Sequence, residues 1–169
     1  MVLALAAVLP LTLSISGAAA ADTKILALGD SLTAGYGLKQ GEGFADQLQT
    51  AFRKMGRPVT VINGGVSGDT TAGGLARIDW VLGDKPQVVI VDELAHTNMP
   101  GAGRGKRWED VVALLDEGIS VISAVNVQHF ESLNDVIRET LGVTVRETVP
   151  DWVVGMADQV INLDISAED

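Results

Sequence analysis

Five apolar runs rich in β-branched residues recur along the chain and predict buried strands. These runs lie at residues 24–29, 59–64, 87–94, 120–127 and 159–165. Each run is almost continuously apolar, which is typical of strands that are covered on both faces in a parallel sheet. The pattern therefore predicts a mainly parallel, five-stranded sheet.

Between these runs, apolar residues recur at helical spacing and predict helices. Four such segments, each ending close to a glycine that signals a helix stop, lie at residues 44–55, 75–82, 108–115 and 133–141. Strict alternation of strands and helices predicts an α/β fold, a three-layer sandwich with a doubly wound sheet. We expect the flavodoxin-like strand order 2-1-3-4-5. Ligands of such folds bind at the carboxyl ends of the strands, so we expect Ser31, Gly68, residues 92–98 and His129 to share one edge of the sheet.

The N-terminal segment resembles a secretory signal. Residues 1–20 are apolar and end in Ala18, Ala19 and Ala20, a pattern typical of signal peptide cleavage sites. No Lys or Arg precedes the apolar run, so an uncleaved hydrophobic tail is the alternative interpretation. The run contains Pro10 and is short for a membrane span. We expect cleavage after Ala20, a single α/β domain over residues 21–169 without a stable membrane span, and a periplasmic or secreted location.

Composition excludes several functions. The formal net charge is −10, which argues against nucleic acid as a partner because phosphate binding needs a basic surface. The chain has no Cys, which excludes disulfides, cysteine catalysis and thiolate metal sites. His96 and His129 are its only histidines, so we expect no multi-histidine metal site.

Two motifs begin within the first two predicted strands and continue past their ends: "ILALGDSLTAGYGL" from residue 25 and "INGGVSGDTTAGGLARIDWVL" from residue 62. With them, residues 22–91 resemble the GDSL, or SGNH, hydrolases, and in particular the exported esterase, thioesterase and lysophospholipase branch. The resemblance implies that Ser31 is a nucleophile whose backbone N–H helps to bind the oxyanion. It also implies that the N–H of Gly68 is a second oxyanion donor. A small ester or thioester would be the substrate, with no cofactor.

Two further blocks of that family are missing. The third predicted strand runs into "VDELAHTNMPG" in place of the GxND block, and Asn98 does not stand at the motif spacing. The C-terminal DxxH block, which supplies the catalytic base, is also absent, because no histidine follows His129. A serine hydroxyl is a poor nucleophile without a base, so we expect impaired ester hydrolysis. His129 and His96, which both follow predicted strands, are the candidate substitutes.

A different resemblance begins at about residue 87. The motifs "DELAHTN", "KRWEDV", "NVQHFESLND" and "RETVPD" follow one another over about 80 residues. With them, residues 87–169 resemble the N-terminal domain of KdpD, the turgor- and potassium-responsive sensor histidine kinase. The resemblance implies a cytoplasmic, P-loop-type regulatory module that binds ATP and Mg²⁺. The segment "VDE" resembles a Walker B element, in which Asp92 would act on Mg²⁺ with Glu93 beside it.

The phosphate-binding loop of such a module is absent. A Walker A motif should follow the first strand, where this chain has "GDSLTAGYG". We interpret "GAGRGKRW" as a surface loop in which Arg104, Lys106 and Arg107 could attract an anion.

The two resemblances meet near "PQVVIVDEL", so the chain is interpreted as a chimera in which each half lacks part of its active site. Three hypotheses follow: a GDSL-type serine esterase, a nucleotide- and Mg²⁺-binding regulatory module, and a folded domain without activity. We favour the esterase, because its nucleophile and leader are present whereas the other half lacks its phosphate loop. The sequence leaves the oligomeric state open.

Overall fold

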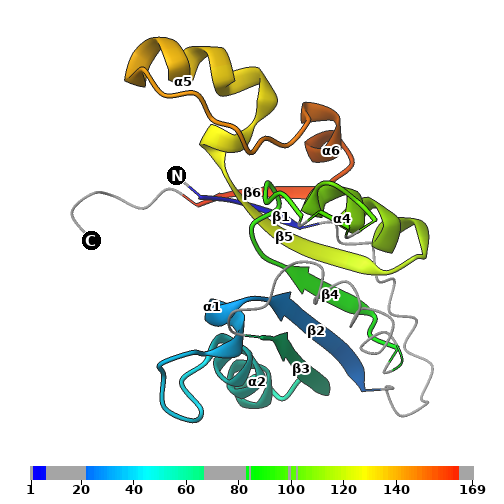
Figure 1. The fold of residues 1–169 in the computed structure, drawn as a ribbon. Coiled ribbons are helices and arrows are strands. Elements are labelled where there is room, and N and C mark those ends of the chain that lie inside the picture. The colour runs from blue at the N-terminus through cyan, green and yellow to red at the C-terminus, as the bar shows by residue number, and fades with distance from the viewer. Residues whose placement is uncertain are drawn as a thin grey trace. The chain divides into compact units, whose positions relative to one another are not determined.

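The chain folds into two compact units. The computed structural model describes residues 2–6, 22–66, 83, 85–98, 100–101 and 103–163 (Figure 1). Residues 10–90 and 99–102 form one unit, called here the serine unit because it contains Ser31. Residues 1–9, 91–98 and 103–169 form the other, called here the carboxylate unit because it contains Asp92. The boundary between Ile90 and Val91 lies inside strand β4 (Val88–Val91), within the segment where the two sequence resemblances meet.

The serine unit contains a parallel pair of strands. Strands β2 (Thr23–Gly29) and β3 (Val59–Gly65) pair in parallel from end to end, and the strand order is β3-β2-β4. This order agrees with the first three positions of the expected flavodoxin-like arrangement. Helices α1 (Ser31–Ala34) and α2 (Phe44–Lys54) follow β2. The α/β class and its parallel sheet are therefore confirmed.

A glutamine side chain completes the outer strand of this unit. The amide of Gln49, on α2, donates to the carbonyl of Val59 at 2.9 Å and accepts from the N–H of Val61 at 2.8 Å. This amide acts as a short substitute for a neighbouring strand, because it satisfies backbone groups that an outermost strand leaves open. The same contacts fix α2 against β3.

The carboxylate unit contains the remaining elements. These are β1 (Val2–Ala6), α4 (Arg107–Asp116), β5 (Ser120–Asn126), the 3₁₀ turns η1 (Val127–His129) and η2 (Glu131–Leu133), α5 (Asn134–Leu141), α6 (Asp151–Gly155) and β6 (Gln159–Leu163). Helix α4 buries Val111 and Leu114, and β5 buries Val121 and Val125 at alternate positions. Trp108 of α4 meets Trp152 of α6 edge to face, with ring centroids 5.4 Å apart.

Strand β1 corrects the predicted sheet. It lies in the segment expected to be a leader, and it pairs antiparallel with β5 on one side and with β6 on the other. The fourth and fifth predicted strands are therefore not neighbours, as the flavodoxin-like order required, and a sixth strand is present. The apolar pattern of residues 1–20 fits a leader and a strand equally well, so it did not reveal the pairing.

Three other expectations concern a helix, a membrane span and the number of domains. The helix predicted at residues 75–82 lies outside the described residues. Among the helices that the structure describes, none combines the length and the apolar character needed to cross a membrane. The single-domain organisation over residues 21–169 stays a prediction.

Candidate functional site

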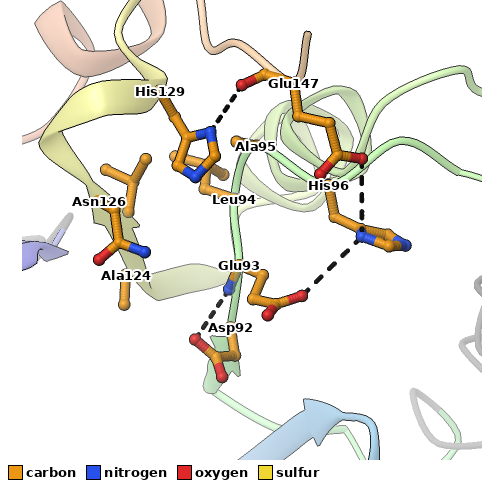
Figure 2. A pocket seen from close by; sticks show the side chains of 10 residues that line it. Asp92, Glu93, Leu94, Ala95, His96, Ala124, Asn126, His129 and Glu147 are labelled. Carbon is orange, nitrogen blue, oxygen red and sulfur yellow. Dashed lines mark hydrogen bonds and ion pairs between the residues drawn. The ribbon is translucent and has the colours of Figure 1, made fainter. Parts of the chain in front are cut away.

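A cavity of about 280 Å³ opens in the carboxylate unit, where the chain leaves β4 and β5 (Figure 2). Its lining consists of Asp92, Glu93, Leu94, Ala95, His96, Ala124, Val125, Asn126, His129 and Glu147. Asp92, Glu93, His96 and His129 thus lie around one space, as expected for residues that follow strand ends. Carboxylates dominate the charged side chains of this lining.

Glu93 adopts an uncommon backbone conformation at this cavity. Its φ angle is +50°, in the left-handed region that non-glycine residues rarely occupy. The carboxylate of Asp92 accepts the N–H of Glu93 at 2.8 Å, and Arg107 donates to the carbonyl oxygen of Asp92 at 2.8 Å. These bonds hold the strained turn, and strain of this kind gathers at functional sites.

His96 lies between two carboxylates of the cavity. Its Nδ1 is 3.9 Å from Oε2 of Glu93 and 3.9 Å from Oε1 of Glu147. Glu147 also accepts the backbone N–H of Thr97 at 2.8 Å. Desolvation raises the pKa of Glu147, but hydrogen bonds from Thr97 and the charges of His96 and Lys106 outweigh it and hold this pKa below its usual value. Glu147 is therefore held in its ionised form beside His96.

The ring of His129 is oriented by the main chain. Its Nδ1 lies 2.7 Å from the carbonyl oxygen of Glu147. A carbonyl only accepts hydrogen bonds, so Nδ1 carries the hydrogen and the neutral ring keeps Nε2 as an acceptor. The second candidate base thus has a defined tautomer in its neutral form.

The basic residues after this cavity are held by internal partners, and Arg107, expected in a surface loop, is the first residue of α4. Lys106 donates to the hydroxyl of Thr97 at 2.7 Å, and Arg107 donates to the carbonyl of Asp92. Arg104 lies 3.5 Å from the carboxylate of Asp110. The structure therefore gives each of these three cations a partner within the carboxylate unit, and nothing about them favours the anion site suggested by the sequence.

Asn98 has a structural environment. The side chain is buried, and its amide donates to the carbonyl of Arg104 at 3.2 Å and to the carboxylate of Asp110 at 2.7 Å. Burial raises the pKa of Asp110, although the hydrogen bond from Asn98 and the charge of Arg104 oppose the rise. This network holds the loop against α4.

The implied Mg²⁺ and ATP fit this cavity poorly. Within the described part of the chain, no group of three or more His, Asp or Glu side chains is arranged to hold a metal ion. The described lining of the cavity contains carboxylates but neither Lys nor Arg that could balance phosphate charge. Asp92 and Glu93 could hold a Mg²⁺ ion together with phosphates, but the described lining offers no cation for those phosphates.

Ser31 occupies a different position, in the serine unit. It is the first residue of α1, directly after β2, and it is half-buried. The carboxylate of Asp30 accepts the N–H of Leu32 at 3.1 Å, and the carbonyl of Ser31 accepts the N–H of Tyr36 at 2.9 Å. The Asp30 cap and this turn fix the backbone on both sides of the hydroxyl.

Two glycines let α1 approach the ends of the strands. A Cβ added to Gly29 would collide with the side chain of Thr33, and one added to Gly65 would collide with the backbone of Thr33 and Ala34. The glycines of "LGDS" and "INGG" are therefore needed for close packing of the turn that carries Ser31. Gly68 lies outside the described residues.

Neither candidate base belongs to the serine unit. His96 and His129 are the only histidines of the chain, and both belong to the carboxylate unit. A base for Ser31 would have to come from that unit, from solvent or from another residue type.

Sequence reasoning missed two polar residues of the cavity, Asn126 and Glu147. Asn126 ends β5, so the strand-end rule could have identified it. Glu147 lies in the "RETVPD" motif, but it follows no predicted strand, and only the fold brings it beside His96.

Comparison with known proteins gives two family matches that overlap between residues 68 and 93. Residues 68–169 match the family model of KdpD, the osmosensitive K⁺ channel His kinase sensor domain, and residues 27–93 match that of the GDSL-like lipase/acylhydrolase family. The sensor protein KdpD of Mycobacterium tuberculosis is 54% identical over 91 residues, which cover 54% of this chain and 11% of that protein. An arylesterase of Vibrio mimicus is 41% identical over 88 residues, covering 52% of this chain and 44% of that protein.

A solved structure extends the similarity to most of the chain. A single-residue mutant of the esterase AlinE4 is 29% identical and aligns with a TM-score of 0.51, covering 89% of this chain and 90% of its own. The chain spans about a tenth of the KdpD relative and less than half of the arylesterase. Because the KdpD model matches more than half of the residues, the chain belongs to the KdpD sensor-domain family, and its first half is similar to GDSL-like esterases.

Proposed function

We propose that this protein is a GDSL-type serine ester hydrolase whose turnover is slow because its own serine unit lacks a histidine base. The observation that carries this proposal is the position of Ser31, at the start of α1 and directly after β2, on a turn that Gly29 and Gly65 pack tightly. A nucleophile on such a turn presents its hydroxyl at the carboxyl end of a parallel strand, where ligands of α/β folds bind.

Apolar side chains beside Ser31 favour an acyl substrate. Leu32, Tyr36 and Leu38 follow Ser31 within eight residues, and their exposed fractions are 71%, 77% and 55%. Exposed apolar side chains close in sequence to a nucleophile can cover the hydrocarbon part of an ester. We therefore expect butyrate esters to react better than acetate esters.

The proposed reaction has two steps. The Oγ of Ser31 attacks the carbonyl carbon of the ester while its proton passes to a base or to water. The bond from this carbon to the alcohol oxygen then breaks, the alcohol takes up a proton and leaves, and the acyl group stays on the serine. Water then attacks the acyl carbon, releasing the acid and restoring the hydroxyl. The backbone N–H groups of Ser31 and Gly68 would bind the oxyanion in both steps. Without an efficient base the first step limits turnover, since base removal in serine hydrolases costs orders of magnitude in rate.

The alternative regulatory function receives less support. Membership of the KdpD sensor-domain family favours a ligand site at Asp92 and Glu93, and the cavity beside them gives such a ligand space. The described lining of the cavity, however, contains neither Lys nor Arg that could balance phosphate charge, and the described residues form no group of three or more His, Asp or Glu side chains arranged to hold a metal ion. Isothermal titration with Mg²⁺-ATP tests this alternative, and heat of binding that Asp92→Asn abolishes would favour it.

Hydrolysis of p-nitrophenyl acetate and butyrate tests the esterase proposal. The full chain is compared with Ser31→Ala and with Thr50→Ala, which removes a hydroxyl from an exposed position of α2 in the same unit. We expect the wild type and Thr50→Ala to share a rate that Ser31→Ala loses. Equal rates from all three proteins would overturn the proposal and favour a folded domain without activity. Circular dichroism shows first that each variant is folded.

A further inference from the structure

Strand β1 is held on both sides by strands that run parallel to each other. It is antiparallel to β5, from Val2 opposite Asn126 to Ala6 opposite Ile122. It is also antiparallel to β6, where the pairs begin with Val2 opposite Leu163. Because β5 and β6 are each antiparallel to β1, they run in the same direction and lie one strand apart (Figure 1). The two strands form a slot that fits one extended segment.

The slot needs an occupant. Without β1, the facing edges of β5 and β6 would each present a row of unpaired backbone N–H and carbonyl groups. Natural sheets protect such edges with charged residues, but β6 (Gln159–Leu163) contains none. Val160, Ile161 and Leu163 of β6 are already 46%, 42% and 46% exposed. A further loss of pairing would leave β6 as an isolated, apolar strand.

We infer that the slot between β5 and β6 is an acceptor for an uncharged, extended segment, and that residues 2–6 of the same chain are its resident strand. Recognition rests on main-chain hydrogen bonds, as in other cases of strand addition, and "VLALA" brings no charge into the sheet. The segment that looks like a leader is thus a structural part of the carboxylate unit.

A consequence concerns processing of the chain. Cleavage after Ala20 would release residues 2–6 and open both edges of the slot at once. A chain that is exported and cleaved therefore cannot keep an intact carboxylate unit, unless a second segment enters the slot. This inference is independent of Ser31 and of ester hydrolysis.

Amide hydrogen exchange of the full chain tests the slot. Ala4→Pro places a residue without an N–H in the middle of β1, where a central strand does not tolerate proline. Ala19→Pro is the control, in the same apolar segment but outside β1. We expect Ala4→Pro to speed exchange in β5 and β6 by about tenfold or more, the factor that corresponds to one lost backbone hydrogen bond. Exchange in β2 and β3 serves as the internal reference and should not change. Ala19→Pro should match the wild type.

A synthetic peptide makes the test decisive. A peptide with the sequence of residues 1–9 should restore slow exchange in β5 and β6 of Ala4→Pro, and the same peptide with proline at its fourth position should not. Equal exchange in the wild type and Ala4→Pro would overturn the inference, and so would failure of the peptide to restore protection. If β5 and β6 of the wild type are protected from exchange only when dimers form, β1 comes from a second copy of the chain, and this result would also overturn the inference.

Discussion

The imidazole of His129 is hydrogen-bonded to the main chain of Glu147, with 2.7 Å between Nδ1 and the carbonyl oxygen. The backbones of the same two segments are also linked, because the N–H of Val149 donates to the carbonyl of His129 at 2.8 Å. The turn after β5 and the segment before α6 are therefore joined by a side chain and by the backbone. The candidate base is thus also a structural residue.

Two substitutions at His129 separate these roles. His129→Ala removes the bond to Glu147 and should lower the free energy of unfolding by about 1 kcal/mol, as measured by urea denaturation. His129→Asn keeps an N–H donor close to the position of Nδ1 and should cost clearly less. Both variants lack Nε2, so both should lose any hydrolysis that uses His129 as a base. Equal destabilisation by Asn and Ala would contradict the assigned hydrogen bond.

The contact between Gly65 and α1 gives a second prediction. A Cβ at position 65 would collide with the backbone of Ala34, so Gly65→Ala must displace the turn that carries Ser31. We expect a loss of about 1–3 kcal/mol in stability, the usual cost of overpacking, together with the loss of Ser31-dependent ester hydrolysis. The measurements are thermal denaturation and p-nitrophenyl butyrate turnover.

Gly155→Ala is the matched control for this substitution. An added Cβ at Gly155 of α6 meets no atom within 4 Å, and alanine favours a helix, so stability should stay unchanged or rise slightly. A Gly65→Ala protein as stable and as active as this control would show that α1 does not depend on the close approach.

The sequence predicted most of the strands because their apolar runs are bounded by glycine, proline or polar residues. The predicted strand at residues 24–29 differs from β2 by one residue at its start, and that at residues 120–127 differs from β5 by one residue at its end. The cavity was half predicted by the same logic, since Asp92 and His129 follow strand ends. Local pattern and fold agree at these positions.

The parts that were missed depend on long-range contacts. The pairing of β1 joins residues 2–6 to strands more than a hundred residues away, and no local pattern encodes that partner. Glu147 reaches the cavity because His129 and Thr97 hold its segment in place. The apolar leader pattern also hid the strand, because a signal segment and a buried strand share the same composition.

The positive φ of Glu93 predicts that glycine at this position stabilises the protein. Glu93→Gly removes the left-handed strain at +50°, which costs about 1–2 kcal/mol for a side-chain-bearing residue, but it makes the unfolded chain more flexible. We expect a net gain of about 0.5–1 kcal/mol in urea denaturation. Glu93→Gln removes the charge but keeps the strain, so it should show no gain. Equal stabilities of the two variants would mean that the turn at Glu93 is not strained.

Glu147 should make the protein sensitive to mild acid. Its folded pKa lies below the usual value of 4.5, so the folded protein binds fewer protons than the unfolded chain as the pH falls through this region. The ionised carboxylate therefore stabilises the fold above pH 4.5, and this contribution is lost as the pH falls through the folded pKa. Wild type should exceed Glu147→Gln in stability at neutral pH, with the difference vanishing in acid. Glu139→Gln, at an exposed position of α5, controls for net charge, and an identical profile for it would contradict the role of Glu147.

Asp110 should act in the opposite direction. Burial raises its folded pKa above 3.8, so between that value and the folded pKa the folded state holds a proton that the unfolded chain has released. Its contribution to stability is therefore full below pH 3.8 and declines as the pH rises through the folded pKa. Asp110→Asn keeps an acceptor for the amide of Asn98 but has no charge to desolvate. The free energy of unfolding of Asp110→Asn relative to wild type should therefore increase as the pH is raised from 3 to 7, because the raised pKa of Asp110 weakens the wild type in this range. Urea denaturation at fixed salt measures this difference. Asp116→Asn, at an exposed position near the end of the same helix, should show no such trend. A relative stability of Asp110→Asn that stays constant with pH would mean that the carboxyl of Asp110 is solvated in the folded protein.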